Sequence, residues 1–211
     1  MDVNEPSRSS SLGPSWFRDL YGATADPWGL EGSWYEDRKR AVVLAALPDP
    51  SYRRAFEPGC ANGALTELLA PRCGELLAHD VAPEAVAATR ERCRGLAQVR
   101  VEEGSILDAW PAGPFDLVVL SELVYYFDAR DRATIRRAAL DALGPGGTLL
   151  AVHWTRAAPD HPTTGDEVHD ELGRLDGLER VAGHVEADFR LDVLARTPPR
   201  AASVAERTGL R

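Results

Sequence analysis

Short apolar runs alternate with amphipathic stretches along most of this chain. Apolar residues at helical spacing predict helices over 36–47, 63–70, 84–94 and 131–143. Runs of strand length and β-type composition predict strands over 54–57, 75–80, 98–101, 115–120 and 148–154. Strands that alternate with helices in this way predict an α/β domain with a mainly parallel sheet and helices on both faces.

The last two strand-like runs, 181–186 and 189–196, follow each other almost directly. A connection this short can join only antiparallel neighbours. The run 115–120 is the most continuous apolar segment, which is typical of a central strand buried on both faces. We therefore expect a seven-stranded, Rossmann-like sheet that ends in an antiparallel hairpin.

The two ends of the chain differ in composition from its middle. Residues 1–14 are rich in Ser, Pro and Gly and are expected to be disordered. From Trp16 onward the chain is aromatic, and residues 15–47 could cap an apolar pocket as a lid. We expect one domain over 15–196, which includes this lid, and a C-terminal tail over 197–211.

Composition limits the possible functions. With 211 residues, 44% of them hydrophobic, the chain can build one full core, and its net charge of −9 argues against a broad nucleic-acid surface. It has neither a membrane-length apolar run nor a signal-peptide pattern, so we expect a cytoplasmic protein. We also expect a monomer or a homodimer. The three cysteines have no C-x-x-C spacing and are expected to be reduced thiols rather than metal ligands.

A turn rich in small residues follows the first predicted strand. Gly59, Ala61 and Gly63 stand at alternating positions before a helix, where small residues let the backbone turn sharply and approach a ligand. Glu57 stands just before them, and Asp80 ends the second strand, where doubly wound sheets hold ribose hydroxyls. These features predict a nucleoside-binding crevice.

Charge narrows the choice of nucleoside. A carboxylate beside the turn would repel the pyrophosphate of a nicotinamide dinucleotide. S-adenosylmethionine (SAM) carries an ammonium, a sulfonium and a ribose, and so suits both acids. The pattern E-x-G-x-(G/A)-x-G resembles motif I of the class I SAM-dependent methyltransferases, with Ala61 where glycine is usual. The residues expected to contact the cofactor here are Glu57, Gly59, Cys60, Ala61, Gly63, Asp80 and Val81.

The loop after the third predicted strand reads Gly104-Ser105-Ile106. In the methyltransferase family that the motif resembles, an acid commonly follows this glycine and binds the adenine amino group. Ser105 takes that position here, so its hydroxyl or a backbone carbonyl would have to serve, with Ile106 against the ring. An ordinary polar loop is the alternative.

Polar and aromatic residues follow the fourth predicted strand. Ser121 and Glu122 stand at its carboxyl end, which faces the crevice in such sheets, and are candidates for contact with the methionine part of the cofactor or with the acceptor. Glu122, a candidate catalytic residue, could equally cap the following helix. Tyr125 and Tyr126 are of types more often found in the core, but one of them could line the acceptor site.

His153 and Trp154 end the fifth predicted strand. The pKa of a histidine is usually near neutrality, so His153 could take a proton from an acceptor amine or hydroxyl. It could instead only position the substrate or bond to the loop. Trp154, Asp166 and His169 are candidates for substrate contact, although the spacing of Asp166 and His169 is also that of a capping pair on a helix.

A closer resemblance extends over about residues 20–196. The segments that carry it are Asp26-Pro27-Trp28, Ser33-Trp34-Tyr35-Glu36 with Lys39, Glu57-Pro58-Gly59-Cys60, Ser121-Glu122 with Tyr125-Tyr126, and His153-Trp154 with Gly165-Asp166-Glu167-Val168-His169. They resemble the nodulation protein S (NodS) methyltransferases, which N-methylate an amino sugar on a chitooligosaccharide. The resemblance implies an N-terminal segment folded over the cofactor, with Trp28 beside it and Lys39 near its carboxylate.

The resemblance implies a Rossmann-like class I methyltransferase fold and methyl transfer from SAM, which leaves S-adenosylhomocysteine (SAH). The expected acceptor is the amine of a small polar molecule, such as an amino sugar or a natural-product intermediate. Alignment of its lone pair with the sulfonium methyl carbon would supply much of the rate. Two alternatives stay open, namely the same fold methylating a hydroxyl, and a non-enzymatic or NAD-binding Rossmann domain.

Overall fold

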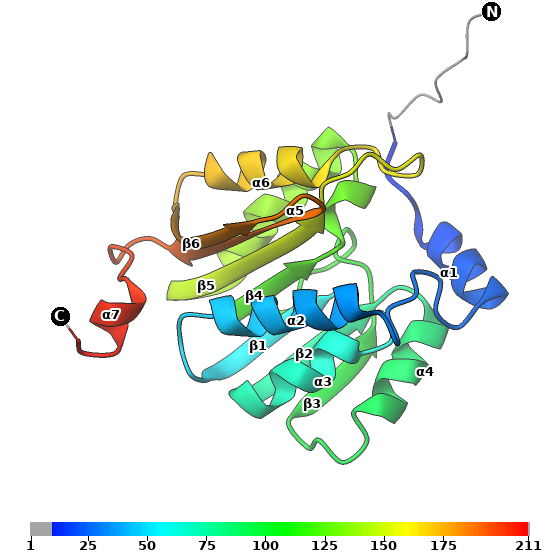
Figure 1. Ribbon diagram of the computed structural model, residues 1–211, viewed down its shortest axis with the longest axis horizontal. Helices are drawn as coiled ribbons and strands as arrows, with labels where there is room; N and C mark the ends of the chain where they lie inside the picture. The colour runs from blue at the N-terminus through cyan, green and yellow to red at the C-terminus, as the bar shows by residue number, and fades with distance from the viewer. Residues whose placement is uncertain (1–9, 211) are drawn as a thin grey trace, which may run out of the picture.

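Seven strands form one mixed sheet in the computed structural model, which describes residues 10–210. The strands are β1 (Tyr52–Pro58), β2 (Cys73–Asp80), β3 (Val99–Glu103), β4 (Phe115–Ser121), β5 (Leu143–Trp154), β6 (Leu178–Val185) and β7 (Phe189–Arg196). Their order is β3-β2-β1-β4-β5-β7-β6, with β1 to β5 parallel and β7 antiparallel to both β5 and β6 (Figure 1). The predicted Rossmann-like sheet with its terminal hairpin is confirmed.

Helices cover both faces of this sheet (Figure 1). They are α1 (Pro14–Ala23), α2 (Trp34–Ala46), α3 (Ala64–Leu69), α4 (Pro83–Arg92), α5 (Ala129–Ala142), α6 (Gly165–Gly173) and α7 (Val204–Arg207), with 3₁₀ turns η1 (Ala70–Arg72) and η2 (Val124–Tyr126). Apolar residues of α5 and α6 pack on one face of the central strands, and those of α2 and α3 pack on the other. α1 lies against the start of α4.

β4 illustrates how the sequence builds two cores at once. Its residues 117–120 are all fully buried, and successive side chains of a strand point to opposite faces. Leu117 and Val119 accordingly belong to the core under α2 and α3, while Val118 and Leu120 belong to the core under α5 and α6. A continuous apolar run is therefore what a strand covered on both faces requires.

The N-terminal segment packs on the domain over more of its length than its composition indicates. Residues 1–9 of the segment expected to be disordered lie outside the described residues. The rest corrects that expectation, because the Leu12 N–H donates to the Tyr126 carbonyl at 2.9 Å and Ser11 Oγ accepts from the Asp128 N–H at 3.0 Å. α1 then begins at Pro14. These partners are more than 100 positions away along the chain, so local composition carries no sign of them.

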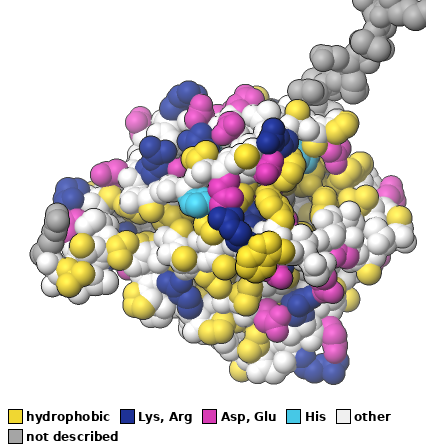
Figure 2. All heavy atoms as spheres, in the orientation of Figure 1, with side chains coloured by type: hydrophobic (Ala, Val, Ile, Leu, Met, Phe, Trp, Pro, Cys, Tyr) yellow, Lys and Arg dark blue, Asp and Glu magenta, His cyan; other side chains and the backbone are white. Residues whose placement is uncertain are grey.

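The surface mixes charges of both signs. On the face shown in Figure 2, Lys and Arg side chains lie among Asp and Glu side chains. Neutralising a nucleic-acid backbone needs clustered cations, and on this face the cations are interspersed with acids. Among the described residues, no helix is long and apolar enough to cross a membrane.

Candidate functional site

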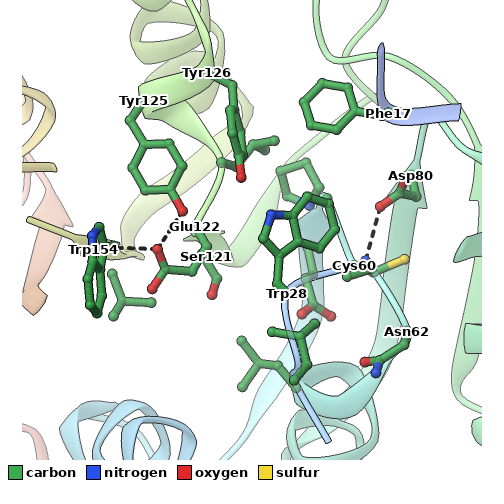
Figure 3. A pocket seen from close by; sticks show the side chains of 18 of the residues that line it. Phe17, Trp28, Cys60, Asn62, Asp80, Ser121, Glu122, Tyr125, Tyr126 and Trp154 are labelled. Carbon is green, nitrogen blue, oxygen red and sulfur yellow. Dashed lines mark hydrogen bonds between the residues drawn. The ribbon is translucent and has the colours of Figure 1, made fainter. Parts of the chain in front are cut away.

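A cavity of about 490 Å³ opens at one edge of the sheet. β1, β2, β4 and β5 are parallel, so their carboxyl ends meet there and bring Glu57, Asp80, Ser121 and Trp154 to its wall. α1, α2 and the loop between them contribute a further part of the wall, including Trp28, which lies between the two ends of the cavity (Figure 3).

The two ends of the cavity have different linings (Figure 3). We call one the glycine-loop end, formed by residues 57–62, Asp80 and residues 104–107. We call the other the aromatic end, formed by Tyr35, Glu122, Tyr125, Tyr126, Trp154 and His161.

The turn after β1 is held close to β2 by backbone hydrogen bonds. The N–H groups of Gly59 and Cys60 both donate to the His79 carbonyl, at 2.7 and 2.9 Å. Gly63 has φ +78°, and a Cβ there would lie 2.9 Å from the Thr89 side chain, so only glycine fits. Ala61 also adopts a left-handed conformation, φ +52°, which is strained for a residue with a side chain. Strain of this kind is typical of ligand sites.

Asp80 braces this turn and faces the cavity. Its Oδ2 accepts from the Ala61 N–H and its Oδ1 from the Ala82 N–H, both at 3.0 Å. Burial raises the pKa of Asp80 to about 6, although these backbone donors favour the charged form. Each oxygen keeps a lone pair for a further donor, which is the geometry that two ribose hydroxyls need.

Glu57 is a buried carboxyl group with an incomplete hydrogen-bond shell. It is 2% exposed, and its Oε2 has no hydrogen-bond partner within residues 10–210. Burial raises its pKa to about 7, so it is partly protonated near neutral pH. Burying a carboxylate without a partner is unfavourable in free energy, and a cationic ligand group beside it would offset that penalty.

The loop after β3 completes the glycine-loop end. The Gly104 N–H donates to the Asp80 carbonyl at 2.9 Å, which holds the loop beside the turn after β1. Ile106 is buried and lines the cavity, together with Val81 and Ser105. Ser105 Oγ accepts from the Leu107 N–H at 3.2 Å, so the hydroxyl also shapes its own turn. Contact of Ser105 with an adenine amino group stays a prediction.

The N-terminal segment contributes an aromatic pair to the cavity. Tyr21 and Trp28 pack edge to face with their ring centroids 5.5 Å apart. The Tyr21 hydroxyl is buried with no hydrogen-bond partner among the described residues, and the charge of Asp80 adds to burial in raising its pKa. Sequence reasoning missed Tyr21, and its only signal was the aromatic composition after Trp16. Trp28, which sequence reasoning placed at the cofactor, lines the cavity at 38% exposure.

Glu122 is the centre of the polar network at the aromatic end. Its Oε1 lies 2.6 Å from Lys39 Nζ. Its Oε2 accepts from the Tyr125 hydroxyl at 2.7 Å and from the Trp154 N–H at 2.8 Å (Figure 3). Glu122 has φ +50°, so this network holds a strained backbone. It caps neither neighbouring helix, because η2 has no side-chain cap and α5 is capped by Asp128.

Two cations of α2 lie at the cavity wall. Lys39 Nζ pairs with Glu36 Oε1 at 2.8 Å as well as with Glu122. Burial opposes the charge of Lys39, but the two carboxylates outweigh it and raise its pKa. Arg40 donates to the Leu30 carbonyl at 3.1 Å and to Asp37 at 2.7 Å, and it also lines the cavity. Sequence reasoning missed Arg40, since nothing in a helical pattern indicates a cavity beside its polar face.

His153 lies behind the cavity rather than in it, which corrects its expected role as a base. The side chain is fully buried, and Nε2 accepts from the Val124 N–H at 3.2 Å. Nδ1 faces His169 Nε2 at 3.2 Å, so both ring nitrogens are occupied. Burial lowers the pKa of His153 well below its usual value, and the neighbouring His169 and Lys39 act in the same direction. The alternative role, a histidine bonded to the loop, is the one the geometry supports.

The expected substrate contacts on α6 also lie outside the cavity. His169 is buried, and its Nδ1 pairs with Asp192 Oδ2 at 2.8 Å. Asp166 is exposed in the first turn of α6, 3.7 Å from Arg190. Neither belongs to the cavity lining. His169 lies on the side of α6 that packs on β5 and β7. Tyr125, Tyr126 and Trp154, by contrast, do line it.

His161 is the histidine that reaches the cavity, and sequence reasoning missed it. It lies in the loop between β5 and α6 and stacks on Tyr125, with ring centroids 4.0 Å apart and an interplanar angle of 15°. Burial lowers the pKa of His161, while Asp160 and Glu122 partly offset that shift. No sequence pattern distinguishes this loop histidine from a solvated one.

Within residues 10–210, no group of three His, Cys, Asp or Glu side chains is placed to hold a metal ion. The cysteines Cys60, Cys73 and Cys93 are buried free thiols.

Known sequences resemble this chain over most of its sheet. The family model described as nodulation protein S (NodS) matches residues 17–152. Nodulation protein S of Rhizobium tropici is 38% identical over 132 residues, which are 61% of this chain and 55% of that protein, so the match spans about half of the relative. Nodulation protein S of Bradyrhizobium diazoefficiens is 35% identical over 161 residues, or 75% of this chain and 72% of that protein.

A solved structure shares the architecture. The crystal structure of the N-methyltransferase NodS from Bradyrhizobium japonicum WM9, in complex with SAH, matches with a TM-score of 0.79 and 26% identity. The match covers 88% of this chain and 99% of that chain.

Proposed function

The chain belongs to the nodulation protein S (NodS) family, and on that premise we propose that it transfers a methyl group from SAM to the amine of a small polar acceptor. An amino sugar or a natural-product amine is the acceptor class we favour. The proposal includes a cytoplasmic location and a monomeric or dimeric state.

The observation that carries the proposal is the pair of carboxyl groups at the glycine-loop end. Glu57 has an oxygen that no described residue bonds, and Asp80 has lone pairs left on both oxygens beside a strained turn. A ligand with an ammonium and a ribose supplies what both acids lack, whereas a pyrophosphate would meet two negative charges. Tyr21 and Trp28 would cover the nucleoside, and Lys39 and Arg40 are the two cations of the cavity wall that could meet a ligand carboxylate.

SAM supplies an electrophilic methyl group on a sulfonium. The aromatic end would hold the acceptor, because Glu122 can accept one more hydrogen bond and Tyr35, Tyr126 and Trp154 offer apolar walls. The nucleophile would be a neutral amine nitrogen, and its alignment would account for most of the acceleration. Glu122 would be held in position to bind the acceptor amine by Lys39, Tyr125 and the Trp154 N–H.

Ligand binding tests the cofactor. SAM and SAH should each raise the melting temperature, because a ligand that prefers the native state stabilises it, while NAD should not. Calorimetric titration with SAH gives the affinity directly. A shift with NAD alone would contradict the proposal and favour a dinucleotide-binding domain.

Matched probes test the acceptor atom. Glucosamine and N-acetylglucosamine carry the same other hydroxyls, but only glucosamine has a free amine. With the purified protein and SAM, SAH should form with glucosamine or with other small primary amines, and not with their N-acetyl counterparts. Equal rates with both sugars would instead indicate methylation of a hydroxyl.

A further inference from the structure

We propose that His161 is the base that receives the proton from the acceptor during methyl transfer. The inference rests on the proposed function and adds to it the group that takes up the proton lost by the acceptor amine. It assigns to a loop histidine the role that sequence position suggested for His153.

Position is the first support for this assignment. His161 lines the same cavity as Glu57 and Asp80, at its aromatic end. It shares Tyr125 with Glu122, because its ring stacks on Tyr125 while the Tyr125 hydroxyl donates to Glu122 Oε2. An amine held by Glu122 would therefore lie on the side of the cavity that His161 lines.

The ring is held in place without using its nitrogens. Tyr125 covers one face of the imidazole, and Tyr126 meets it edge to face with centroids 5.0 Å apart. No hydrogen bond from any residue of 10–210 occupies Nδ1 or Nε2 of His161. His153 differs on this point, because Val124 and His169 occupy both of its ring nitrogens. Of the two, only His161 has a lone pair that a substrate proton can reach.

The surroundings keep His161 neutral at physiological pH. Burial against Tyr125 and Tyr126 lowers its pKa below the usual 6.5, and this outweighs the carboxylates of Asp160 and Glu122, which act in the opposite direction. His153, the other histidine that packs against Tyr125, is also neutral because burial lowers its pKa further. A neutral imidazole beside a cavity can accept a proton, whereas an imidazolium cannot.

The proposed step balances in atoms and charge. The acceptor enters as R–NH₃⁺ and passes one proton to His161, which leaves R–NH₂ and an imidazolium. The nitrogen–carbon bond then forms as the carbon–sulfur bond breaks, and the electron pair stays on sulfur. The products are R–NH₂–CH₃⁺ and neutral SAH, and His161 returns its proton to solvent.

Histidine NMR of the full chain tests the assignment without turnover. The chain has five histidines, so a spectrum of His161→Gln identifies the His161 signal. In the wild type this signal should titrate below pH 6.5 and should shift when SAH is added, because the ring lines the same cavity. A His161 signal that is indifferent to SAH, or that titrates above pH 7, overturns the proposal whether or not a probe is methylated.

Kinetics with the best amine probe supply the second test. We expect His161→Gln to lower kcat about 100-fold or more, as loss of a general base does, and to remove the acid limb of the pH–rate profile. The SAH affinity should stay within about twofold, because the glycine-loop end is unchanged. Imidazole added to His161→Ala should restore part of the rate. His184→Gln is the matched control, since His184 lies on β6 away from the cavity.

The outcomes separate this inference from the proposed function. A wild type that binds no SAH contradicts the function itself. A wild type that binds SAH and methylates an amine, together with a His161→Gln variant whose kcat and pH profile are unchanged, overturns only the role of His161.

Discussion

The two ends of the cavity are built in different ways. The glycine-loop end consists of short segments that each follow one strand, and its geometry is fixed by backbone hydrogen bonds such as those from Gly59 and Cys60 to His79. The aromatic end is fixed by side chains that meet from distant parts of the chain, with Lys39 and Glu122 83 positions apart. The first kind of site is determined by local sequence, and the second requires the whole fold.

The two ends also differ in charge balance. At the glycine-loop end, burial raises the pKa of Glu57 to about 7 and that of Asp80 to about 6, so both carboxyl groups would gain from a ligand donor or cation. At the aromatic end, Glu122 already has Lys39, Tyr125 and the Trp154 N–H as partners. The glycine-loop end therefore has carboxyl groups that a cationic ligand group could pair with, whereas the carboxylate of the aromatic end is already held by protein partners.

The largest expected effect is at Asp80. Asp80→Ala removes the proposed acceptor of two ribose hydroxyls, so SAH should bind weaker by about 3 kcal/mol, roughly 150-fold. Asp80→Asn keeps one oxygen and should lose less. Calorimetric titration measures both, and Asp176→Ala, which removes an exposed carboxylate, is the control. Full affinity in a folded Asp80→Ala protein would mean that the ribose is held elsewhere.

The next largest effect concerns the support of the aromatic end. His153→Ala leaves the Val124 N–H and the Nε2 atom of His169 without partners and creates a cavity, so we expect a loss of about 2–3 kcal/mol in the free energy of unfolding. In a chain of this size that lowers the melting temperature by about 5–10 °C. His184→Ala, which changes a half-exposed histidine, should have little effect. A stable His153→Ala protein with lost turnover would restore its role as a base.

The buried His153 should also make the free energy of unfolding depend on pH. Because the folded pKa of His153 lies well below 6.5, the unfolded chain binds the additional proton first as the pH falls below 6.5. Stability should therefore decline from that pH downward. The decline should be shallower in His153→Ala, as followed by urea unfolding at several pH values.

A smaller effect tests the charge of the glycine-loop end. The carboxyl of Glu57, whose pKa is about 7, ionises as the pH rises, and only the ionised form attracts an ammonium. SAH should therefore bind about tenfold tighter at pH 8 than at pH 6. Glu57→Gln should bind weakly with a flatter pH profile. If the wild type shows no pH dependence in this range, Glu57 does not face the ammonium.

The smallest effect sharpens the role of the N-terminal segment. Trp28→Ala removes an aromatic contact over the cavity, and we expect SAH to bind about fivefold weaker, near 1 kcal/mol. Trp34→Ala is a matched control, because Trp34 is 76% exposed and does not line the cavity. Equal affinities of the two variants would show that Trp28 is only a surface residue.

The sequence by itself determined the sheet and the glycine-loop end. The patterns that predicted them are local: strand periodicity, the Gly59–Gly63 turn and the acid at position 80. Parallel strands have their carboxyl ends at the same edge of the sheet, so these local patterns are brought together by the sheet alone. The sequence therefore predicted the seven-stranded topology and placed Glu57, Asp80 and Ile106 on the cavity wall.

Only the tertiary structure decided which polar residues serve the aromatic end. His153 and His161 stand eight positions apart, and both follow or end β5, yet packing against η2 and α6 buries the first and the loop turns the second into the cavity. That the His153 ring is buried with both nitrogens bonded depends on Val124, His169 and Tyr125, which come from other elements. Contacts of this range leave no periodic trace in a sequence, because they are set by packing between elements rather than within one.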